Sequence, residues 1–253
     1  MFTRAIVRTP GRSMAAGLTK ANLGIPDYKK ALLQHRQYID ALESCGLEVL
    51  VLAADDEYPD STFVEDVALF TRHCAIITRP AAASRIGETT GIRPVLQRYH
   101  ACIEKVLAPG TLDGGDVMQV GEHFYIGISA RTNAHGAEQL IAILERYGMT
   151  GSTVNVTGYL HLKTGVTCVA EQTLLAAGEF VSRPEFSHLT ILPVADEETG
   201  AANCIHINGR ILMPAGFPKT RKQLAERESQ IIEVDISEFA KLDGGLTCLS
   251  LRF

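Results

Sequence analysis

The sequence contains no run of basic residues, and its formal net charge is −5 over 253 residues. A protein that follows a nucleic-acid backbone needs Lys and Arg gathered in a patch, so the charge pattern argues against nucleic-acid binding. A mild negative charge is compatible with a small cationic substrate, although it does not identify one.

Long apolar stretches and paired cysteines are also missing. No segment approaches the roughly 20 apolar residues that a membrane-spanning helix needs, and residues 1–10 lack the apolar core of a signal peptide. No C-x-x-C pair occurs, which argues against a disulfide framework or a structural zinc site. We therefore expect a cytoplasmic protein without a membrane partner, with mostly reduced and buried thiols. The six scattered cysteines are Cys45, Cys74, Cys102, Cys168, Cys204 and Cys248.

The pattern that is present is a repeat. An apolar strand, a polar loop, a strand hairpin and a helix follow one another several times along the chain. The expected helices cover residues 85–99, 132–147 and 220–227, with a short helical run near Phe180. The expected opening strands are 47–52, 103–109, 152–157, 189–194 and 231–235.

The fifth copy runs out of chain, and the N-terminal segment supplies what it lacks. Residues 3–10 read as a strand, and residues 27–45 as a helix with Asp27 as its N-cap. Asn208-Gly209 between two apolar runs predicts a tight hairpin. We therefore expect the two chain ends to complete one unit, so that residues 1–253 form one closed ring and a single α/β domain.

Polar residues begin the hairpin of each copy at a spacing of about 45 residues. In a closed ring, equivalent positions face a common axis. The repeat therefore predicts a central pocket that gathers carboxylates, an imidazole, an amide and a thiol. The residues at these positions are Glu65, Asp66, Asp113, His161, Asn203 and Cys248.

Each of these residues has an ordinary structural interpretation when it is taken alone. Cys248 follows a Gly-Gly turn and could be a reactive thiol, but a lone cysteine is more often a small buried hydrophobe. His161 lies between leucines, where most histidines are structural. In LDGGDVM, Asp113 and Asp116 could form a solvated loop, or one could orient an imidazole while the other anchors the turn.

The remaining charged candidates also have two interpretations each. Asp60, Glu65 and Asp66 surround an apolar segment, where they suit either a solvated edge strand or a pocket filled by a cation. Arg85 and Arg131 could be surface residues, or they could grip a carboxylate with two hydrogen bonds. The order and spacing of the whole set are more specific than any one member.

Together the motifs FVED, LDGGDV with FYIGISARTN, LHLKTG and DGGLTCLSLRF resemble the dimethylarginine dimethylaminohydrolases of the guanidine-modifying amidinotransferase (pentein) superfamily. The resemblance runs from TRAIVRTP to the last residue. It implies a five-bladed α/β propeller with a central active-site pocket. It also implies a hydrolase that converts dimethylarginine or monomethylarginine to citrulline and the alkylamine through a covalent cysteine intermediate, with neither a metal nor an organic cofactor. A homodimer is compatible with the resemblance.

The resemblance also assigns roles by position. It implies Cys248 as the nucleophile, His161 as the acid/base and Asp113 as the third catalytic residue. Segment 11–25 would be a lid over the pocket, and Phe63 beside the acids could form an apolar wall for the methyl groups. Asp60, Glu65 and Asp66 would lie near the guanidinium, Arg85 and Arg131 would hold the α-carboxylate, and the carbonyls of Leu18 and Leu242 would receive the α-amino group.

Two alternatives accompany this interpretation. Arginine deiminases resemble the chain in the same motifs, but they are usually longer and carry an added helical domain that is not visible here. A ribosome anti-association factor uses a similar propeller for binding alone and lacks the catalytic residues, which argues against a non-catalytic role for a chain with Cys248 and His161.

Overall fold

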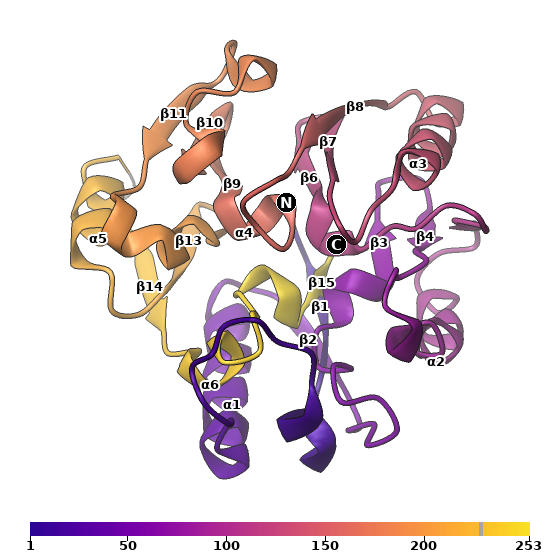
Figure 1. Cartoon of the computed structure of the whole chain (residues 1–253), viewed down its shortest axis with the longest axis horizontal. Helices are drawn as coiled ribbons and strands as arrows, with labels where there is room; N and C mark the ends of the chain where they lie inside the picture. The colour runs from indigo at the N-terminus through magenta and orange to yellow at the C-terminus, as the bar shows by residue number, and fades with distance from the viewer. Residues whose placement is uncertain (228–229) are drawn as a thin grey trace.

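The computed structural model describes residues 1–227 and 230–253, and within them five three-stranded sheets surround a common centre (Figure 1). In each sheet an antiparallel hairpin carries a third strand that pairs in parallel with the second strand of the hairpin. The larger helices lie at the periphery of the ring. The predicted five-bladed α/β propeller is confirmed.

The five sheets follow the chain in order. The first contains β3 (Ala68–Phe70), β4 (Ala75–Ile77) and β5 (Ile103–Lys105). The second contains β6 (Val117–Val120), β7 (His123–Ile128) and β8 (Thr150–Asn155). The third contains β9 (Val166–Ala170), β10 (Thr173–Ala176) and β11 (Thr190–Pro193). The fourth contains β12 (Ile205–Ile207), β13 (Arg210–Pro214) and β14 (Ile231–Val234), and the fifth contains β15 (Leu251–Arg252), β1 (Arg4–Arg8) and β2 (Glu48–Leu52).

The fifth sheet closes the ring as the repeat predicts. β1 pairs antiparallel with β15, with Ala5 opposite Arg252, and parallel with β2. The predicted boundaries of the copies differ from the structure in one respect. The strand expected to open each copy pairs with the hairpin of the preceding copy, as β5 does with β4. A strand that returns from a crossover pairs in parallel with the strand that led into it, so each unit runs hairpin, crossover, strand.

Local sequence signals set the helix ends. Asp27 caps α1 (Tyr28–Ser44) by accepting a hydrogen bond from the Lys30 amide at 3.0 Å. Asn133 caps α3 (Ala134–Arg146) in the same way through the Gly136 amide. Asn208 and Gly209 have φ of 50° and 80°, the positive values that a two-residue hairpin of the predicted kind requires.

One helix prediction was too long. The helix expected at 85–99 is divided into a 3-10 turn, η3 (Ala83–Arg85), and α2 (Glu88–Leu96). The short helical run expected near Phe180 is present as the 3-10 turns η5 (Gly178–Phe180) and η6 (Pro184–Phe186). The other helices are η1 (Arg12–Ala16), α5 (Pro218–Ala225) and α6 (Ser237–Ala240). Within the described ranges, none of the helices has the length and apolar character needed to cross a membrane.

A short helical turn precedes the first strand of every hairpin, and neighbouring turns pack against one another around the centre. FVED, expected as part of a strand, belongs to one of them. Five apolar clusters support the turns from outside; the face of α3 that contains Leu140 and Leu144, for example, packs on Ile126 of β7. The turns are η2 (Val64–Val67), η4 (Gly114–Asp116), α4 (Leu162–Gly165), η7 (Asp196–Ala202) and η8 (Thr247–Leu249).

Candidate active site

A small chamber of about 30 Å³ lies where these turns meet, beneath segment 11–25. Asp113, Glu65 and Asn203 are the predicted site residues that do not line it. The predicted residues that do line it are Leu18, Asp60, Phe63, Asp66, Arg85, Arg131, His161, Leu242 and Cys248.

His161 is held by a carboxylate that has no exposed surface. Nε2 of His161 lies 3.1 Å from Oδ2 of Asp113, whose Oδ1 accepts a hydrogen bond from the Ala81 amide. Burial alone lowers the pKa of an imidazole, but the charge of Asp66 and the hydrogen bond to Asp113 outweigh it. The pKa of His161 rises to about 9, so the ring is an imidazolium at neutral pH.

The second acid of LDGGDVM has a different position. Asp116 accepts hydrogen bonds from the Leu162 amide at 2.9 Å and from the hydroxyls of Ser129 and Thr132 at 2.6 and 2.7 Å. Burial raises its pKa to about 6 against these hydrogen bonds. Asp113 therefore meets the imidazole, while Asp116 ties the start of α4 to the loop after β7.

Cys248 lies in η8 with part of its surface open to the chamber. The Gly245 amide donates a hydrogen bond to Sγ at 3.4 Å. A Cβ atom on Gly245 would lie 2.5 Å from the side chain of Asn203, so this turn requires glycine. Burial, followed by the nearby charges of Glu65 and Asp66, raises the pKa of the thiol to about 12. At rest, the site therefore pairs a neutral thiol with an imidazolium.

Asn203, the amide of the predicted central set, positions the cysteine turn rather than lining the small chamber. Its Oδ1 accepts a hydrogen bond from the Thr247 amide at 2.9 Å, and its Nδ2 donates to the Thr247 hydroxyl at 3.0 Å. Nδ2 also donates to the carbonyl of Lys163 at 2.8 Å. The amide thus joins the turn that contains Cys248 to the turn that follows His161.

Asp66 and Arg85 form a buried ion pair at one end of the small chamber. Nη1 of Arg85 lies 2.5 Å from Oδ2 of Asp66, whose Oδ1 accepts a hydrogen bond from the Gly115 amide. Burial raises the pKa of Asp66, but the positive charges of His161 and Arg85 outweigh it and lower the pKa overall. Arg85 also makes two hydrogen bonds with Glu88, a residue that the sequence did not suggest.

The two arginines of the chamber differ in how many of their N–H groups already have protein partners. Besides Asp66 and Glu88, Arg85 donates to the carbonyls of Asp60 and Phe63, so it retains little donor capacity for a ligand. The side chain of Arg131 is 20% exposed, and its ion pair with Asp113 is long, at 3.9 Å. Arg131 is therefore the guanidinium in the chamber that is better placed to accept a bound anion.

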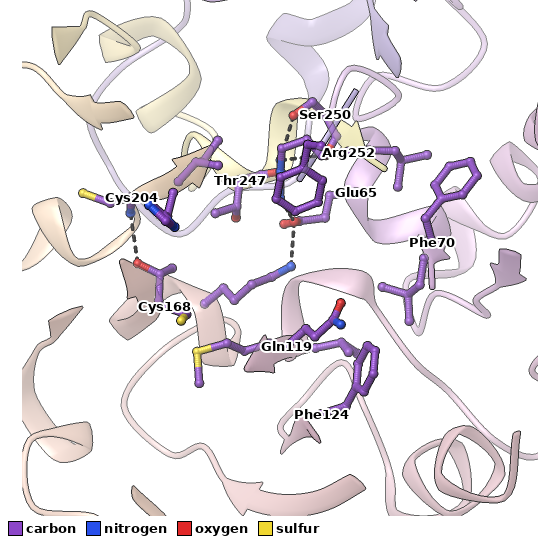
Figure 2. A pocket seen from close by; sticks show the side chains of 18 of the residues that line it. Glu65, Phe70, Gln119, Phe124, Cys168, Cys204, Thr247, Ser250 and Arg252 are labelled. Carbon is purple, nitrogen blue, oxygen red and sulfur yellow. Dashed lines mark hydrogen bonds and ion pairs between the residues drawn. The ribbon is translucent and has the colours of Figure 1, made fainter. Parts of the chain in front are cut away.

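Glu65 lies on the other side of the central turns. Its Oε1 pairs with Lys163 Nζ at 2.6 Å and with Arg252 Nη2 at 3.0 Å. These groups line a channel of about 250 Å³ along the inner strands (Figure 2). The sequence did not single out Lys163 or Arg252, although they lie within LHLKTG and LTCLSLRF. Glu65 thus lines the channel with its carboxylate paired to two cations, and its contact with a guanidinium remains a prediction.

Segment 11–25 covers the small chamber and is tied to its rim. The Leu18 amide donates to Oδ1 of Asp60 at 3.0 Å, and the Lys20 amide donates to Oδ2 of Asp243 at 2.6 Å. The Thr19 hydroxyl donates to the carbonyl of Lys241. The contacts of Thr19 and Lys20 join the segment to the loop that contains Leu242, and the contact of Leu18 joins it to Asp60 in the lining of the chamber.

Asp66, Asp113 and His161 offer ligand atoms that lie within 4.8 Å of one another, which is close enough for a metal ion. A metal ligand must be a neutral imidazole, whereas the raised pKa keeps His161 protonated at neutral pH. A proton therefore competes with a metal at this position.

Proteins of one family share this sequence and architecture. The family model described as N,N dimethylarginine dimethylhydrolase, eukaryotic, matches residues 26–250. The N(G),N(G)-dimethylarginine dimethylaminohydrolase of Pseudomonas aeruginosa is 54% identical across 100% of both chains. The protein of the same name from Streptomyces coelicolor is 40% identical across 98% of this chain and 96% of its own.

Solved structures give the same result. A Cys-to-Ser mutant of the P. aeruginosa protein, complexed with citrulline, matches with a TM-score of 0.99 at 54% identity and full coverage of both chains. The N-terminal domain of ArgZ, described as a cyanobacterial arginine dihydrolase, has a TM-score of 0.90 at 16% identity, which shows the shared fold alone. The match of the family model and the full-length identity place the chain in a family: it is a member of the dimethylarginine dimethylaminohydrolases.

Proposed function

We propose that the protein hydrolyses Nω,Nω-dimethyl-L-arginine, and also Nω-monomethyl-L-arginine, to L-citrulline and the corresponding amine. The observation that carries the proposal is a chamber lined by Cys248 and His161, together with Asp66 and Arg131. Asp113 lies behind the imidazole and is hydrogen-bonded to it. The relatives at 54% and 40% identity are dimethylarginine dimethylaminohydrolases, and one solved relative binds citrulline.

The charges of the chamber suit a zwitterionic cation. Asp66 and Asp60 face the guanidinium, and Arg131 takes the α-carboxylate with two hydrogen bonds. Arg85 lies near that carboxylate, and its contacts with Asp66 also hold the acid in position. The carbonyls of Leu18 and Leu242 receive the α-amino group. These groups fix the guanidinium carbon in front of Sγ of Cys248.

The bound cation supplies what the free site lacks. A positive guanidinium beside Sγ favours the thiolate, and so lowers the pKa that burial, Glu65 and Asp66 hold near 12. The thiol proton passes to solvent as the substrate binds, because His161 is already protonated. The thiolate attacks the guanidinium carbon and forms a tetrahedral adduct. His161, already protonated, donates its proton to the departing amine as the C–N bond breaks, which leaves a thiouronium on Cys248.

The same imidazole serves the second half of the reaction. His161 is neutral after the amine leaves, and it takes a proton from a water molecule that attacks the thiouronium carbon. The C–S bond then breaks, which releases citrulline and the free thiol. Asp113 holds the ring through Nε2 in both steps and stabilises the imidazolium. No step of this sequence requires a metal or an organic cofactor.

Phe63 favours methylated arginine over arginine in this proposal. Its ring lines the small chamber and is fixed edge-on against Phe239, with centroids 6.4 Å apart. The methyl groups contact this apolar wall, whereas a bare nitrogen would be buried without a partner at a cost of about 1–3 kcal/mol. A short arginine deiminase is the alternative, and it would show the opposite preference.

The proposal extends to the setting of the enzyme. Residues 1–253 act as one catalytic domain, in the cytoplasm, on a small-molecule substrate. A homodimer is the assembly that we expect.

Product analysis tests the proposed function directly. Purified protein is incubated with asymmetric dimethylarginine, and citrulline and dimethylamine are measured together. Equal amounts of the two products are expected from the wild-type protein and none from Cys248→Ser. Citrulline without dimethylamine, or turnover by the serine variant, would contradict the mechanism.

A further inference from the structure

The side chains that react lie between two chambers. Besides the small chamber, a large chamber of about 750 Å³ adjoins it. Leu160, His161, Asp243, Gly244 and Cys248 line both. A guanidinium carbon placed before Cys248 therefore has one chamber on each side.

The small chamber contains the groups that hold both ends of the substrate: the acids that face the guanidinium and the arginine that takes the α-carboxylate. Its volume of about 30 Å³ leaves no space for ω-substituents larger than methyl groups. The leaving nitrogen must lie within reach of His161 to receive a proton, and His161 stands where the chambers meet. Substituents larger than the methyl groups that contact Phe63 consequently extend past His161 into the large chamber.

The walls of the large chamber have the chemistry to receive such substituents. Val156 and Ile236 are buried in its lining, and the rings of Tyr159 and Phe217 are partly buried there. Apolar lining of this kind, in a cavity of several hundred Å³, is typical of sites that enclose small organic ligands.

We propose that the large chamber is a subsite for the ω-nitrogen substituent, and that the protein hydrolyses arginines with larger ω-N-alkyl or arylalkyl groups. This inference rests on the proposed function and names a wider substrate class for the same site. The chemistry is unchanged: water replaces the amine at the guanidinium carbon, the C–N bond to the substituted nitrogen breaks, and citrulline and the free alkylamine form.

A series of substrates with growing substituents tests this subsite. Nω-methyl-, Nω-propyl- and Nω-(2-phenylethyl)-L-arginine are compared by amine release, with dimethylarginine in parallel. We expect kcat/KM for the larger two to stay within about tenfold of the methyl compound, because a misfitted methylene in a tight pocket alone changes it by about 10- to 200-fold. A loss of a hundredfold or more at propyl, with dimethylarginine still hydrolysed, overturns the subsite and leaves the proposed function intact.

Binding separates the subsite from catalysis. The Cys248→Ser variant is titrated with the same series by calorimetry. Affinity that holds or rises with substituent size supports the subsite even if dimethylarginine hydrolysis fails, which would contradict only the proposed function. Affinity that falls a hundredfold from methyl to propyl overturns the subsite.

A substitution that fills the large chamber provides the structural control. Ala215 is exposed at the wall of this chamber after β13 and does not line the small chamber. Ala215→Trp should lower kcat/KM for the phenylethyl compound at least tenfold and leave that for the methyl compound within about twofold. Ala101→Trp, at an exposed position outside both chambers, should change neither. Equal loss for both substrates, or no loss for either in Ala215→Trp, contradicts the proposal.

Discussion

Nε2 of His161 and Oδ2 of Asp113 lie 3.1 Å apart, and the carboxylate is completely shielded from solvent. The pair fixes the orientation of the imidazole and favours its charged form. A protonated imidazole beside a neutral thiol means that the acid for amine departure is ready before the nucleophile is. The substrate cation then completes the site by favouring the thiolate.

Removing the charge of Asp113 should change both the rate and its pH dependence. Asp113→Asn should lower kcat at least about 100-fold, because the amide can hold the wrong tautomer of the ring and does not stabilise the imidazolium. Asp113 raises the pKa of His161, so its replacement should lower that pKa and move the basic limb of the pH–rate profile to lower pH. Asp113→Glu is the matched control and should retain part of the activity. A profile in Asp113→Asn identical to that of the wild type would argue against this role.

The raised pKa of Cys248 gives a prediction for the free enzyme. The thiolate is the species that alkylates, so inactivation by iodoacetamide should be slow at pH 7 and should accelerate about tenfold per pH unit up to pH 9. Arginine analogues should protect the enzyme by occupying the small chamber. Inactivation that is fast and independent of pH over this range would show that the resting site already contains a thiolate.

His161 should make the stability of the fold depend on pH. Its pKa is raised from 6.5 to about 9 on folding, so the folded state favours the imidazolium. This contribution is fully present below pH 6.5 and is lost as the pH rises through about 9; its size is about 3 kcal/mol. The free energy of unfolding of the wild type minus that of His161→Gln should fall by this order between pH 6 and 10. A difference that stays constant would contradict the raised pKa.

Substitutions of the two arginines should have different effects, with Arg131 affecting substrate binding and Arg85 affecting stability. Arg131 has a weak protein partner, so Arg131→Ala should weaken binding of arginine substrates by about 2–5 kcal/mol. Methylated agmatine, which has no carboxylate, should be nearly unaffected. Equal weakening of both ligands would show that Arg131 does not contact the α-carboxylate.

Arg85→Ala is the companion to that experiment. Arg85 neutralises Asp66 and Glu88 in the interior, so its loss leaves two buried charges without their partner. The expected result is a loss of about 3–5 kcal/mol in the free energy of unfolding, measured by denaturant titration, for both free and ligand-bound protein. Normal stability with selectively weakened carboxylate binding would instead give Arg85 the role that the resemblance implies.

The sequence predicts the ring and the contents of its centre because both follow from local patterns. Asp66, His161 and Cys248 begin equivalent hairpins, and the closing of the ring turns that equivalence into proximity. The boundaries of the copies do not follow from local patterns. They depend on the pairing of β5 with β4, which is a contact between distant residues that sequence periodicity does not encode. FVED reads as strand because it leads directly into the apolar run VALF, yet residues 64–67 form a 3-10 turn at the centre of the ring.

The residues that pair with the predicted acids were the part of the site that the sequence predicted least well. Lys163 and Arg252 lie two and four residues beyond His161 and Cys248, at positions that the repeat does not align with Glu65, so the spacing does not indicate that the three meet. Glu88 could have been suspected, because it lies three residues after Arg85 on a helical run. The division of the pocket into two chambers depends on side-chain packing at Leu160 and Gly244, which no linear pattern describes.

One competition measurement tests the central claim most directly. Equal concentrations of asymmetric dimethylarginine and arginine are supplied together to the purified protein, and dimethylamine and ammonia are quantified from the same reaction, with Cys248→Ser as the blank. The account predicts an excess of dimethylamine of about 5- to 150-fold, from the cost of about 1–3 kcal/mol for burying an unpaired donor. Ammonia in excess would show a short arginine deiminase and contradict the assigned substrate.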